Sequence, residues 1–403
     1  MIYLDYNATT PVDKQVIAAL TQCLESTYGN PSSSHKLGQA AKAALETSRN
    51  QVASLLHCPS DAILFLSGGT ESINYVLKGM LNSSLKQRHI ITSVIEHIAV
   101  LDTCKFLQEE HGFDVTYVPV NAHGCIDIND VIAAIRPSTC LITIMHANNE
   151  VGAIQPIGEM AIAARNRHKE LIAKESTTTF DPLLIHTDSS QSVGKIPVHV
   201  DALYVDFVTV AGHKLYAPKG IGALYIRPGT RTLQKFMHGA GHEKGLRAGT
   251  ENIPYAVALG TACAMAQDFL ENENGQNKLW SLRETLLKHL EDKLSDVDMA
   301  INGPKIENHV LPNTLSIGFR NVQAAPLLRL IEDRVAASAG SACHSNATSI
   351  SAVLKAMKVD PEYAMGTLRL SVGKYTTKEE LEKASEIIAN AIHQQLNKRQ
   401  RIK

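Results

Sequence analysis

The sequence has no long apolar run, no excess of charge of one sign and no paired-cysteine motif. With 39 Lys and Arg against 40 Asp and Glu, the net charge gives no reason to expect nucleic acid or a membrane surface as a ligand. No stretch approaches the about 20 apolar residues of a membrane span, and no basic flank precedes an apolar run after Met1. The seven cysteines are scattered and never spaced as C-x-x-C, which is typical of a reducing compartment. We therefore expect a soluble, cytoplasmic protein.

The length and composition of the chain allow a sizeable core. Its 403 residues, 44% of them hydrophobic and 20% charged, predict a globular protein of two or three domains and exclude a disordered one. Seven short apolar segments, with helix-like stretches between several of them, read as buried strands: residues 62–66, 90–94, 115–120, 141–146, 183–188, 207–210 and 222–226. This alternation predicts an α/β fold with a mostly parallel sheet covered by helices.

Polar side chains follow several of these segments at the point where the apolar run ends. The carboxyl ends of parallel strands meet at one edge of a sheet, where open α/β proteins bind their ligands. We therefore expect an active site at that edge. The side chains that the pattern places there are Glu96, His97, Asn148, Asn149, Glu150, His186, Asp188, Gln191, His213 and Lys214.

Lys214 stands at the end of a strand-like run and a small-residue turn, directly after His213. A desolvated lysine in such a place can lose its proton and attack a carbonyl, so one hypothesis is a Schiff-base lysine. The alternative is a solvated loop lysine, which is what most lysines are. This stretch by itself favours the alternative.

Residues 67–72 (S-G-G-T-E-S) lead from a predicted strand into a helix that we expect to begin near Ile73. Free amides at a helix N-terminus suit a phosphate, and glycines let a ligand approach the backbone. The loop is neither a Walker loop nor a complete G-x-G-x-x-G. A glycine-rich turn with a threonine cap is an equally good interpretation.

Three further segments carry weaker signals. Residues 5–11 read as a turn-rich lead into a helix, and residues 165–182 as a polar surface excursion. The loop 238–252 contains His238 and His242, whose spacing matches no zinc pattern, so we expect a flexible loop and no metal site.

The chain predicts two domains with a boundary inside a helix, near Gly260. Residues 15–259 form the larger α/β domain, and residues 1–14 and 260–403 form a smaller α+β domain, with strands at 314–319 and 368–372. A last helix begins at Thr377, where Glu380 completes a capping box. The smaller domain carries Cys343 in a run of small residues, which favours either a reactive thiolate beside His344 or a free surface thiol.

Together these segments resemble the cysteine desulfurase and selenocysteine lyase family of pyridoxal-phosphate enzymes, within the class V aminotransferases, over nearly the whole chain. The residues that carry the resemblance are 3–11, 29–33, 67–72, 96–97, 148–150, 186–188, 191–195, 212–214, 340–343 and 369–373. The resemblance implies fold type I, with a mostly parallel seven-stranded sheet. Ala211 and the residues around Thr250 and Cys343 look closest to the selenocysteine lyase branch, and Ala211 replaces a hydroxyl residue that many desulfurases have.

The resemblance also implies a role for each site residue. Lys214 would hold pyridoxal 5'-phosphate covalently and move the proton at the substrate α-carbon. Asp188 would keep the ring nitrogen protonated, and His97 would stack on the ring and assist proton transfer. The remaining contacts would be Asn149 and Gln191 with the ring substituents, Gly69, Thr70 and His213 with the phosphate, Thr250 from the partner subunit of a homodimer, and Asn30 with Arg369 on the substrate carboxylate.

Cys343 would decide the reaction. In a desulfurase its thiolate takes sulfur from L-cysteine, which leaves L-alanine and a persulfide that passes sulfur to an acceptor, such as an acceptor protein. In a selenocysteine lyase, the alternative, selenium leaves L-selenocysteine and the cysteine protonates or discriminates. An aminotransferase of the same fold, a non-catalytic sulfur-carrier binding module and a metal hydrolase rank below these two hypotheses.

Overall fold

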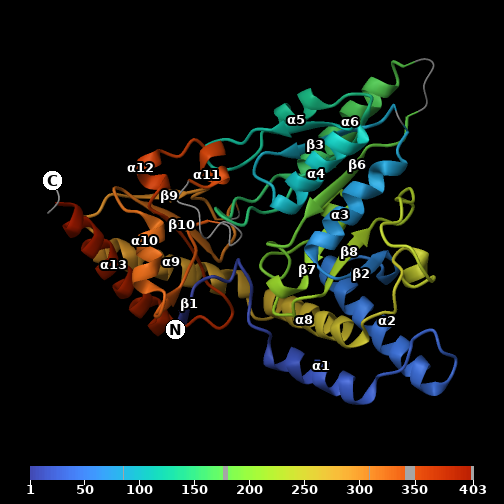
Figure 1. Ribbon diagram of the computed structural model, residues 1–403, viewed down its shortest axis with the longest axis horizontal. Coiled ribbons are helices and arrows are strands. Elements are labelled where there is room, and N and C mark those ends of the chain that lie inside the picture. Colours follow the sequence, from blue (N-terminus) through green and yellow to red (C-terminus); the bar gives the residue numbers. More distant parts are fainter. Residues whose placement is uncertain (85, 176–179, 308, 341–349, 401–403) are drawn as a thin grey trace.

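The computed structural model describes residues 1–84, 86–175, 180–307, 309–340 and 350–400. The chain forms two bodies that lie side by side in Figure 1, the larger one blue to yellow and the smaller one orange to red. None of the helices in the described ranges is long and apolar enough to cross a membrane.

The larger body is built on a sheet that has seven strands within the described residues, in the order β2-β8-β7-β6-β5-β3-β4. The strands are β2 (Ile63–Leu66), β3 (His89–Ser93), β4 (Asp114–Val118), β5 (Thr139–Thr143), β6 (Leu184–Asp188), β7 (Phe207–Ala211) and β8 (Gly222–Ile226). β8 runs antiparallel to β2 and β7, and the other pairs are parallel. The predicted mostly parallel α/β sheet is therefore confirmed.

Helices cover both faces of this sheet, which explains its continuous apolar strands. Neighbouring strand residues point to opposite faces. Ile90 belongs to the apolar cluster that includes α3 (Gly69–Gly79) and α4 (Ile98–His111), whereas Ile91 belongs to the cluster that includes α2 (Lys36–Leu56) and α8 (Ile253–Glu271). The further helices of this body are α1 (Lys14–Ser26), α5 (Ile128–Ala134), α6 (Ile157–Ile172) and α7 (Val200–Leu203).

Two expectations about these helices are wrong. α3 begins at Gly69, four residues before the expected start at Ile73, because the glycine-rich loop itself forms its first turn. The predicted surface excursion at 165–182 is helical at its start, since α6 continues to Ile172 and buries Ala164 and His168.

The smaller body contains an antiparallel sheet with the order β12-β10-β9. Its strands are β9 (Met299–Asn302), β10 (Thr314–Phe319) and β12 (Thr367–Ser371), and its helices are α9 (Gly275–Lys293), α10 (Ala324–Ile331), α11 (Ala352–Ala356), α12 (Pro361–Ala364) and α13 (Lys378–Gln400). Thr377 Oγ1 accepts from the Glu380 amide at 3.2 Å and the Glu380 carboxylate accepts from the Thr377 amide at 3.0 Å, which confirms the capping box before α13.

The N-terminus belongs with the smaller body in space. β1 (Ile2–Tyr3) pairs in parallel with β11 (Val335–Ala336). Gly260 lies inside the continuous helix α8, where a Cβ would come within 2.7 Å of Ser48 Cα on α2. Glycine therefore allows α8 to approach α2 closely. The position of the boundary between the two domains, near Gly260, stays a prediction.

Candidate active site

The carboxyl ends of β3, β5, β6 and β7 meet at one edge of the large sheet, as parallel strands require. His97 caps α4 after β3, Asp188 ends β6, and Lys214 ends the 3₁₀ turn η3 (Gly212–Lys214) after β7. Burial lowers the pKa of His97, Asp188 raises it and Lys214 lowers it, so Asp188 and Lys214 both lie within electrostatic reach of the imidazole. The structure therefore brings a carboxylate, an imidazole and an amine together.

The amine of Lys214 is held by backbone carbonyls of the N-terminal segment. Lys214 Nζ donates to the carbonyl oxygens of Asn7 at 2.5 Å and Ala8 at 2.7 Å, and the side chain is half-buried. Gly212 is needed in the turn, because a Cβ there would lie 2.8 Å from the carbonyl oxygen of Ile221. Lys214 is thus fixed inside the site and is not a solvated loop lysine.

Asn7 is the centre of this arrangement, although the sequence pattern pointed only to a turn. Its carbonyl accepts from Gln191 Nε2 at 3.0 Å as well as from Lys214. Its side chain connects both bodies through these partners: Asn149 O at 3.2 Å, Thr314 Oγ1 at 2.8 Å, Asn313 Nδ2 at 3.0 Å and Lys195 Nζ at 3.3 Å. We call Asn7, Gln191, Lys195 and Lys214 the lysine network.

Asp188 is a buried carboxylate with local donors. Its Oδ1 accepts from the backbone amide of Ser190 at 2.9 Å and from Ser190 Oγ at 2.6 Å. These two contacts hold the carboxylate in place at the sheet edge. A carboxylate at this edge is suited to hold the proton of a heterocyclic nitrogen.

The start of α3 forms an open cradle for an anion. Gly68 has a φ of 153°, which favours glycine, and within the described residues no side chain caps the helix. A Cβ on Gly69 would lie 3.3 Å from both the Ala211 Cβ and Ser190 Oγ, so a side chain there would fill the space. Thr70 is exposed. The uncapped amides and the lack of a side chain at Gly69 fit a phosphate group. Residues 68–70 are called the phosphate loop below.

Two further polar contacts involve His213, which is expected to contact a phosphate, and Glu71, which directly follows the phosphate loop. His213 lies beside Thr9, with 3.1 Å between Nδ1 and Oγ1, and burial lowers its pKa to about 4, so the ring is neutral at pH 7. Glu71 accepts from Arg247 Nε at 3.0 Å and from the Ser67 amide at 2.6 Å. The second contact ties the loop that contains Arg247 to the first turn of α3.

Glu96 is a buried carboxyl next to His97. The sequence indicated no specific role for it. Its Oε1 accepts from Ser93 Oγ at 2.6 Å, and both its oxygens lie 3.0 Å from the Met145 amide. Burial raises the pKa of Glu96 to about 8 despite these donors. The carboxyl thus joins the turn before His97 to the end of β5.

Arg369 on β12 is 1% exposed and faces the same site from the smaller body. Its Nη2 pairs with Asp5 Oδ1 at 2.7 Å, and its Nη1 donates to the carbonyl of Asn149 at 3.2 Å. Within the described residues its buried Nε has no hydrogen-bond partner. The guanidinium is therefore anchored next to Asn149 with donor capacity left for an anion.

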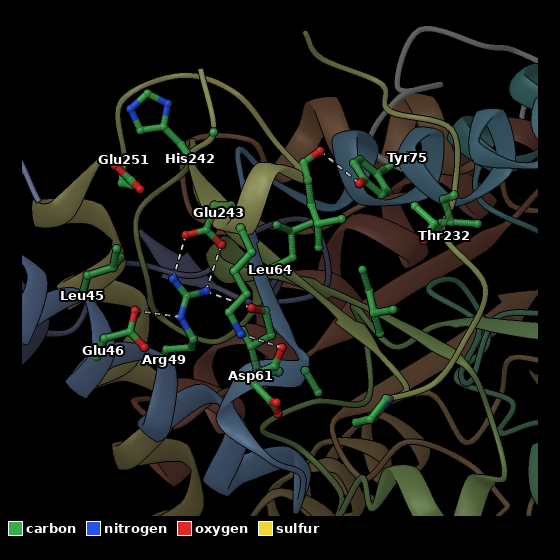
Figure 2. A pocket seen from close by; sticks show the side chains of 18 of the residues that line it. Leu45, Glu46, Arg49, Asp61, Leu64, Tyr75, Thr232, His242, Glu243 and Glu251 are labelled. Carbon is green, nitrogen blue, oxygen red and sulfur yellow. Dashed lines mark hydrogen bonds and ion pairs between the residues drawn. The ribbon is translucent and has the colours of Figure 1, made fainter. Parts of the chain in front are cut away.

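The single chain does not bring Asn30 or Thr250 to Arg369 or Lys214. The turn between α1 and α2, which carries Asn30, lies far from β9 and β10 in Figure 1. The neighbours Pro31, Ser32 and Glu251 instead line a separate cavity of about 610 Å³. Figure 2 shows this cavity, with the buried pair of Arg49 and Glu243 at 2.7 Å.

A second cavity of about 580 Å³ lies between the two bodies and reaches the active site. His97 and Asn149 line it from the larger body. Cys343 falls outside the described residues, but Gly340 and Ile350, which flank that stretch, both line this cavity. Ser351 Oγ donates to Glu150 Oε2 at 2.5 Å, so Ser351 contacts the residue that follows Asn149.

Known proteins resemble the chain over nearly its whole length. Residues 2–384 match the family described as aminotransferase class-V. The chain is 42% identical over 393 residues to the cysteine desulfurase IscS of Dictyoglomus turgidum, which covers 97% of this chain and 94% of the relative. It is 40% identical over 396 residues to the cysteine desulfurase IscS of an Enterobacter species, with 97% and 92% covered.

Solved structures agree with these relatives. A NifS-like protein superimposes with a TM-score of 0.86 at 34% identity over 96% of this chain and 98% of its own. A structure described as SspA in complex with cysteine has a TM-score of 0.76 at 33% identity, with 94% and 100% covered. Cysteine, and not selenocysteine, is the amino acid in the names of these relatives, so they favour the first of the two reactions expected above.

Proposed function

Because the chain belongs to the cysteine desulfurase family of class V aminotransferases, we propose that it is a pyridoxal-phosphate-dependent enzyme that removes sulfur from L-cysteine and leaves L-alanine. The observation that carries the proposal is the convergence of Lys214, Asp188 and His97 at one sheet edge, beside the phosphate loop. Bound pyridoxal phosphate supplies a ring that withdraws electrons from the substrate α-carbon.

The residues of the site fit this cofactor. Lys214 provides the amine that holds it covalently and then moves the proton at the substrate α-carbon. Asp188 would hold the proton of the ring nitrogen, and His97 would lie against the ring. The other proposed contacts are Gly69, Thr70 and His213 with the phosphate, and Asn149 and Gln191 with the ring substituents.

Arg369 is the proposed partner of the substrate carboxylate. Its guanidinium is held in place by Asp5 and the Asn149 carbonyl, which orients it before substrate arrives. A planar guanidinium can bind a carboxylate in bidentate fashion. Asn30 and Thr250 belong to the proposal only in a homodimer, in which a partner subunit would supply them.

Cys343 is the proposed sulfur acceptor of the enzyme. Its thiolate attacks the sulfur of L-cysteine and forms an S–S bond, while the bond between that sulfur and the substrate β-carbon breaks. The β-carbon takes the electron pair and a proton and becomes the methyl group of alanine. The product is a persulfide on Cys343, which passes sulfur to an acceptor.

The test measures cofactor binding and alanine release together. Wild-type protein is expected to bind pyridoxal phosphate with visible absorbance and to release alanine from L-cysteine. Lys214→Ala is expected to lose the covalent attachment and at least about 10⁴-fold in rate. Lys383→Met, an exposed lysine on α13, is the control. A wild-type protein that never binds the cofactor would overturn the proposal.

A second variant tests the role of Cys343. Cys343→Ser is expected to bind the cofactor as wild type does but to form no persulfide and no alanine from L-cysteine. Its rate with L-selenocysteine separates the two reactions of the family: loss of both reactions would make Cys343 an obligatory nucleophile, whereas retained release of alanine from L-selenocysteine alone would indicate the chemistry of the lyase branch. Retained release of alanine from L-cysteine would overturn the proposed role of Cys343.

A further inference from the structure

A second lysine is buried in the active site and has no part in the proposed reaction. Lys195 is 7% exposed, and its Nζ donates to Gln191 Oε1 at 2.7 Å and to Asn7 Oδ1 at 3.3 Å. Burial and the cations Lys214 and Arg369 hold the pKa of Lys195 well below its usual value. A buried amine is costly, so its two contacts call for an explanation.

Both partners of Lys195 are amide side chains, and each has one donor end and one acceptor end. The Nδ2 of Asn7 is used by Asn149 O and Thr314 Oγ1, so its Oδ1 must face Lys195. The same reasoning applies to Gln191, whose Oε1 faces Lys195 while its Nε2 donates to the Asn7 carbonyl. Lys195 therefore has an acceptor on each side. Asn7 Oδ1 also accepts from Asn313 Nδ2 at 3.0 Å, so other contacts orient Asn7 as well, and the contact of Lys195 with Gln191 Oε1 is the one that bears on the site.

The orientation of the Gln191 amide matters because its N–H end bonds to a carbonyl that Lys214 also uses. The Asn7 carbonyl that accepts from Gln191 Nε2 also accepts from Lys214 Nζ. The donor end of Gln191 thus lies on the side of the reactive amine. If the amide were turned over, an oxygen would face that carbonyl and the negative oxygen substituent of a bound ring.

We propose that Lys195 is a positioning residue, which fixes the Gln191 amide so that its N–H end faces Lys214 and the oxygen substituent of the cofactor ring. The inference rests on the proposed function, because it needs the cofactor on Lys214. A donor on the ring oxygen stabilises its negative charge and weakens its hold on the proton of the nitrogen that joins Lys214 to the cofactor. Loss of that donor therefore raises the pKa of this nitrogen.

The experiment follows the visible absorbance of the cofactor-loaded enzyme as a function of pH. In Lys195→Met, which keeps the length of the side chain but no donor, the pKa of the absorbance transition is expected to rise by about one unit, the size of one hydrogen bond to a charged group. The kcat for alanine release is expected to fall about tenfold, with KM nearly unchanged. Lys383→Met is the matched control and is expected to change neither value.

A double-mutant cycle separates orientation from charge. Gln191→Leu removes the amide, so adding Lys195→Met to it should produce no further shift in the pKa of the transition. An equal shift in both backgrounds would show that Lys195 acts through its own charge and would overturn the proposal, as would an unchanged transition in Lys195→Met. If Lys195→Met does not fold, Lys195→Gln, which keeps an N–H donor with shorter reach, replaces it and is expected to show a smaller shift in the same direction.

Failure of the proposed function gives a different result. In that case the wild-type protein shows no visible absorbance with pyridoxal phosphate at all. Failure of the present inference alone leaves the wild-type absorbance in place and removes only the effect of the Lys195 substitution.

Discussion

The two ends of the proposed cofactor site are built differently. The lysine network is buried or half-buried, and its polar groups bond to residues of the same chain from both bodies. The phosphate loop is half-buried at Gly68 and Gly69 and exposed at Thr70, and among the described residues no side chain caps it. The chain thus organises the reactive amine in advance and leaves the phosphate end for a ligand to complete.

Because of this difference, substitutions at the two ends should change two different quantities, the stability of the free protein and its affinity for the cofactor. The hydrogen bonds of the lysine network are already present in the cofactor-free protein, so a substitution in this network should lower the stability of the cofactor-free enzyme. On the phosphate side, the contacts form only with ligand, so a change there should lower cofactor affinity and leave the free protein nearly as stable.

The largest expected effect is that of Asn7→Ala in the lysine network. The substitution removes one hydrogen bond each from Asn149, Thr314, Asn313 and Lys195, and each of these residues keeps another partner. A hydrogen bond contributes about 0.5–1.5 kcal/mol net, so we expect the loss of these four to lower the free energy of unfolding by roughly 3–5 kcal/mol. The thermal midpoint of the cofactor-free enzyme measures it and should fall by several degrees.

Asn74→Ala is the matched control on the phosphate side. Asn74 Nδ2 donates to the Thr70 carbonyl at 3.0 Å in an exposed position, so its loss should cost less than about 0.5 kcal/mol. Equal midpoints for the two variants would mean that the lysine network adds nothing to folding, and the comparison between the two ends would fail.

The sequence predicted the sheet and the edge at which the site lies, but it did not predict the role of Asn7 at the centre of the lysine network. Apolar runs with polar ends predicted the strands of the large sheet and the edge where His97, Asp188 and Lys214 meet, because parallel strands place their carboxyl ends together. Asn7 was missed, since its partners Asn149 and Thr314 lie 142 and 307 residues away in sequence. No local pattern marks a residue whose role arises only when two bodies pack around it.

Burial also explains what the sequence could not show for Glu96 and α6. The sequence placed Glu96 at the expected edge of the site, but only the packing of β3 against β5 shows that its carboxyl is enclosed. Residues 165–172 are mostly polar, so the sequence did not indicate that α6 continues through them. One buried stripe is enough to hold an amphipathic helix against the sheet. The role of Cys343 stays a prediction, since it falls outside the described residues.

The next prediction concerns the pH dependence that burial gives to Glu96, the neighbour of His97. The pKa of Glu96 is about 8 in the folded protein, above its ordinary value of 4.5, so the folded state keeps a proton that the unfolded chain releases. The resulting stability is complete below about pH 4.5 and is lost as pH rises to about 8, by about 1.4 kcal/mol per unit.

Glu96→Gln should remove this slope, because an amide does not titrate in that range. The difference in thermal midpoint between the cofactor-free variant and wild type should therefore shift in favour of the variant from pH 5 to pH 8. The amide facing Met145 N adds a constant offset, so the change with pH is the quantity to read. Parallel curves for the two proteins would contradict a protonated Glu96.

Gly69→Ala tests the phosphate end with a smaller effect. The new Cβ would lie 3.3 Å from the Ala211 Cβ and Ser190 Oγ and occupy the space proposed for the phosphate. We expect cofactor affinity to fall about 10- to 100-fold, which corresponds to about 1.4–2.7 kcal/mol. Equilibrium titration with pyridoxal phosphate measures it. The thermal midpoint of the cofactor-free variant should stay close to wild type, and a large drop there would place Gly69 with the folding contacts instead.

The smallest effect is expected for Arg247→Met, which removes the cation beside the phosphate loop. Burial raises the pKa of Glu71, but the hydrogen bonds from Arg247 and Ser67 outweigh it and hold the pKa below its usual value. Without Arg247 the Glu71 carboxylate stays charged near neutral pH and repels the phosphate. Because the pair is partly exposed, we expect only about a threefold loss of cofactor affinity, greatest at low salt. Arg320→Met, which breaks an exposed pair in the smaller body, is the control and should not change affinity. A loss that persists unchanged at high salt would assign Arg247 a steric role in holding its loop.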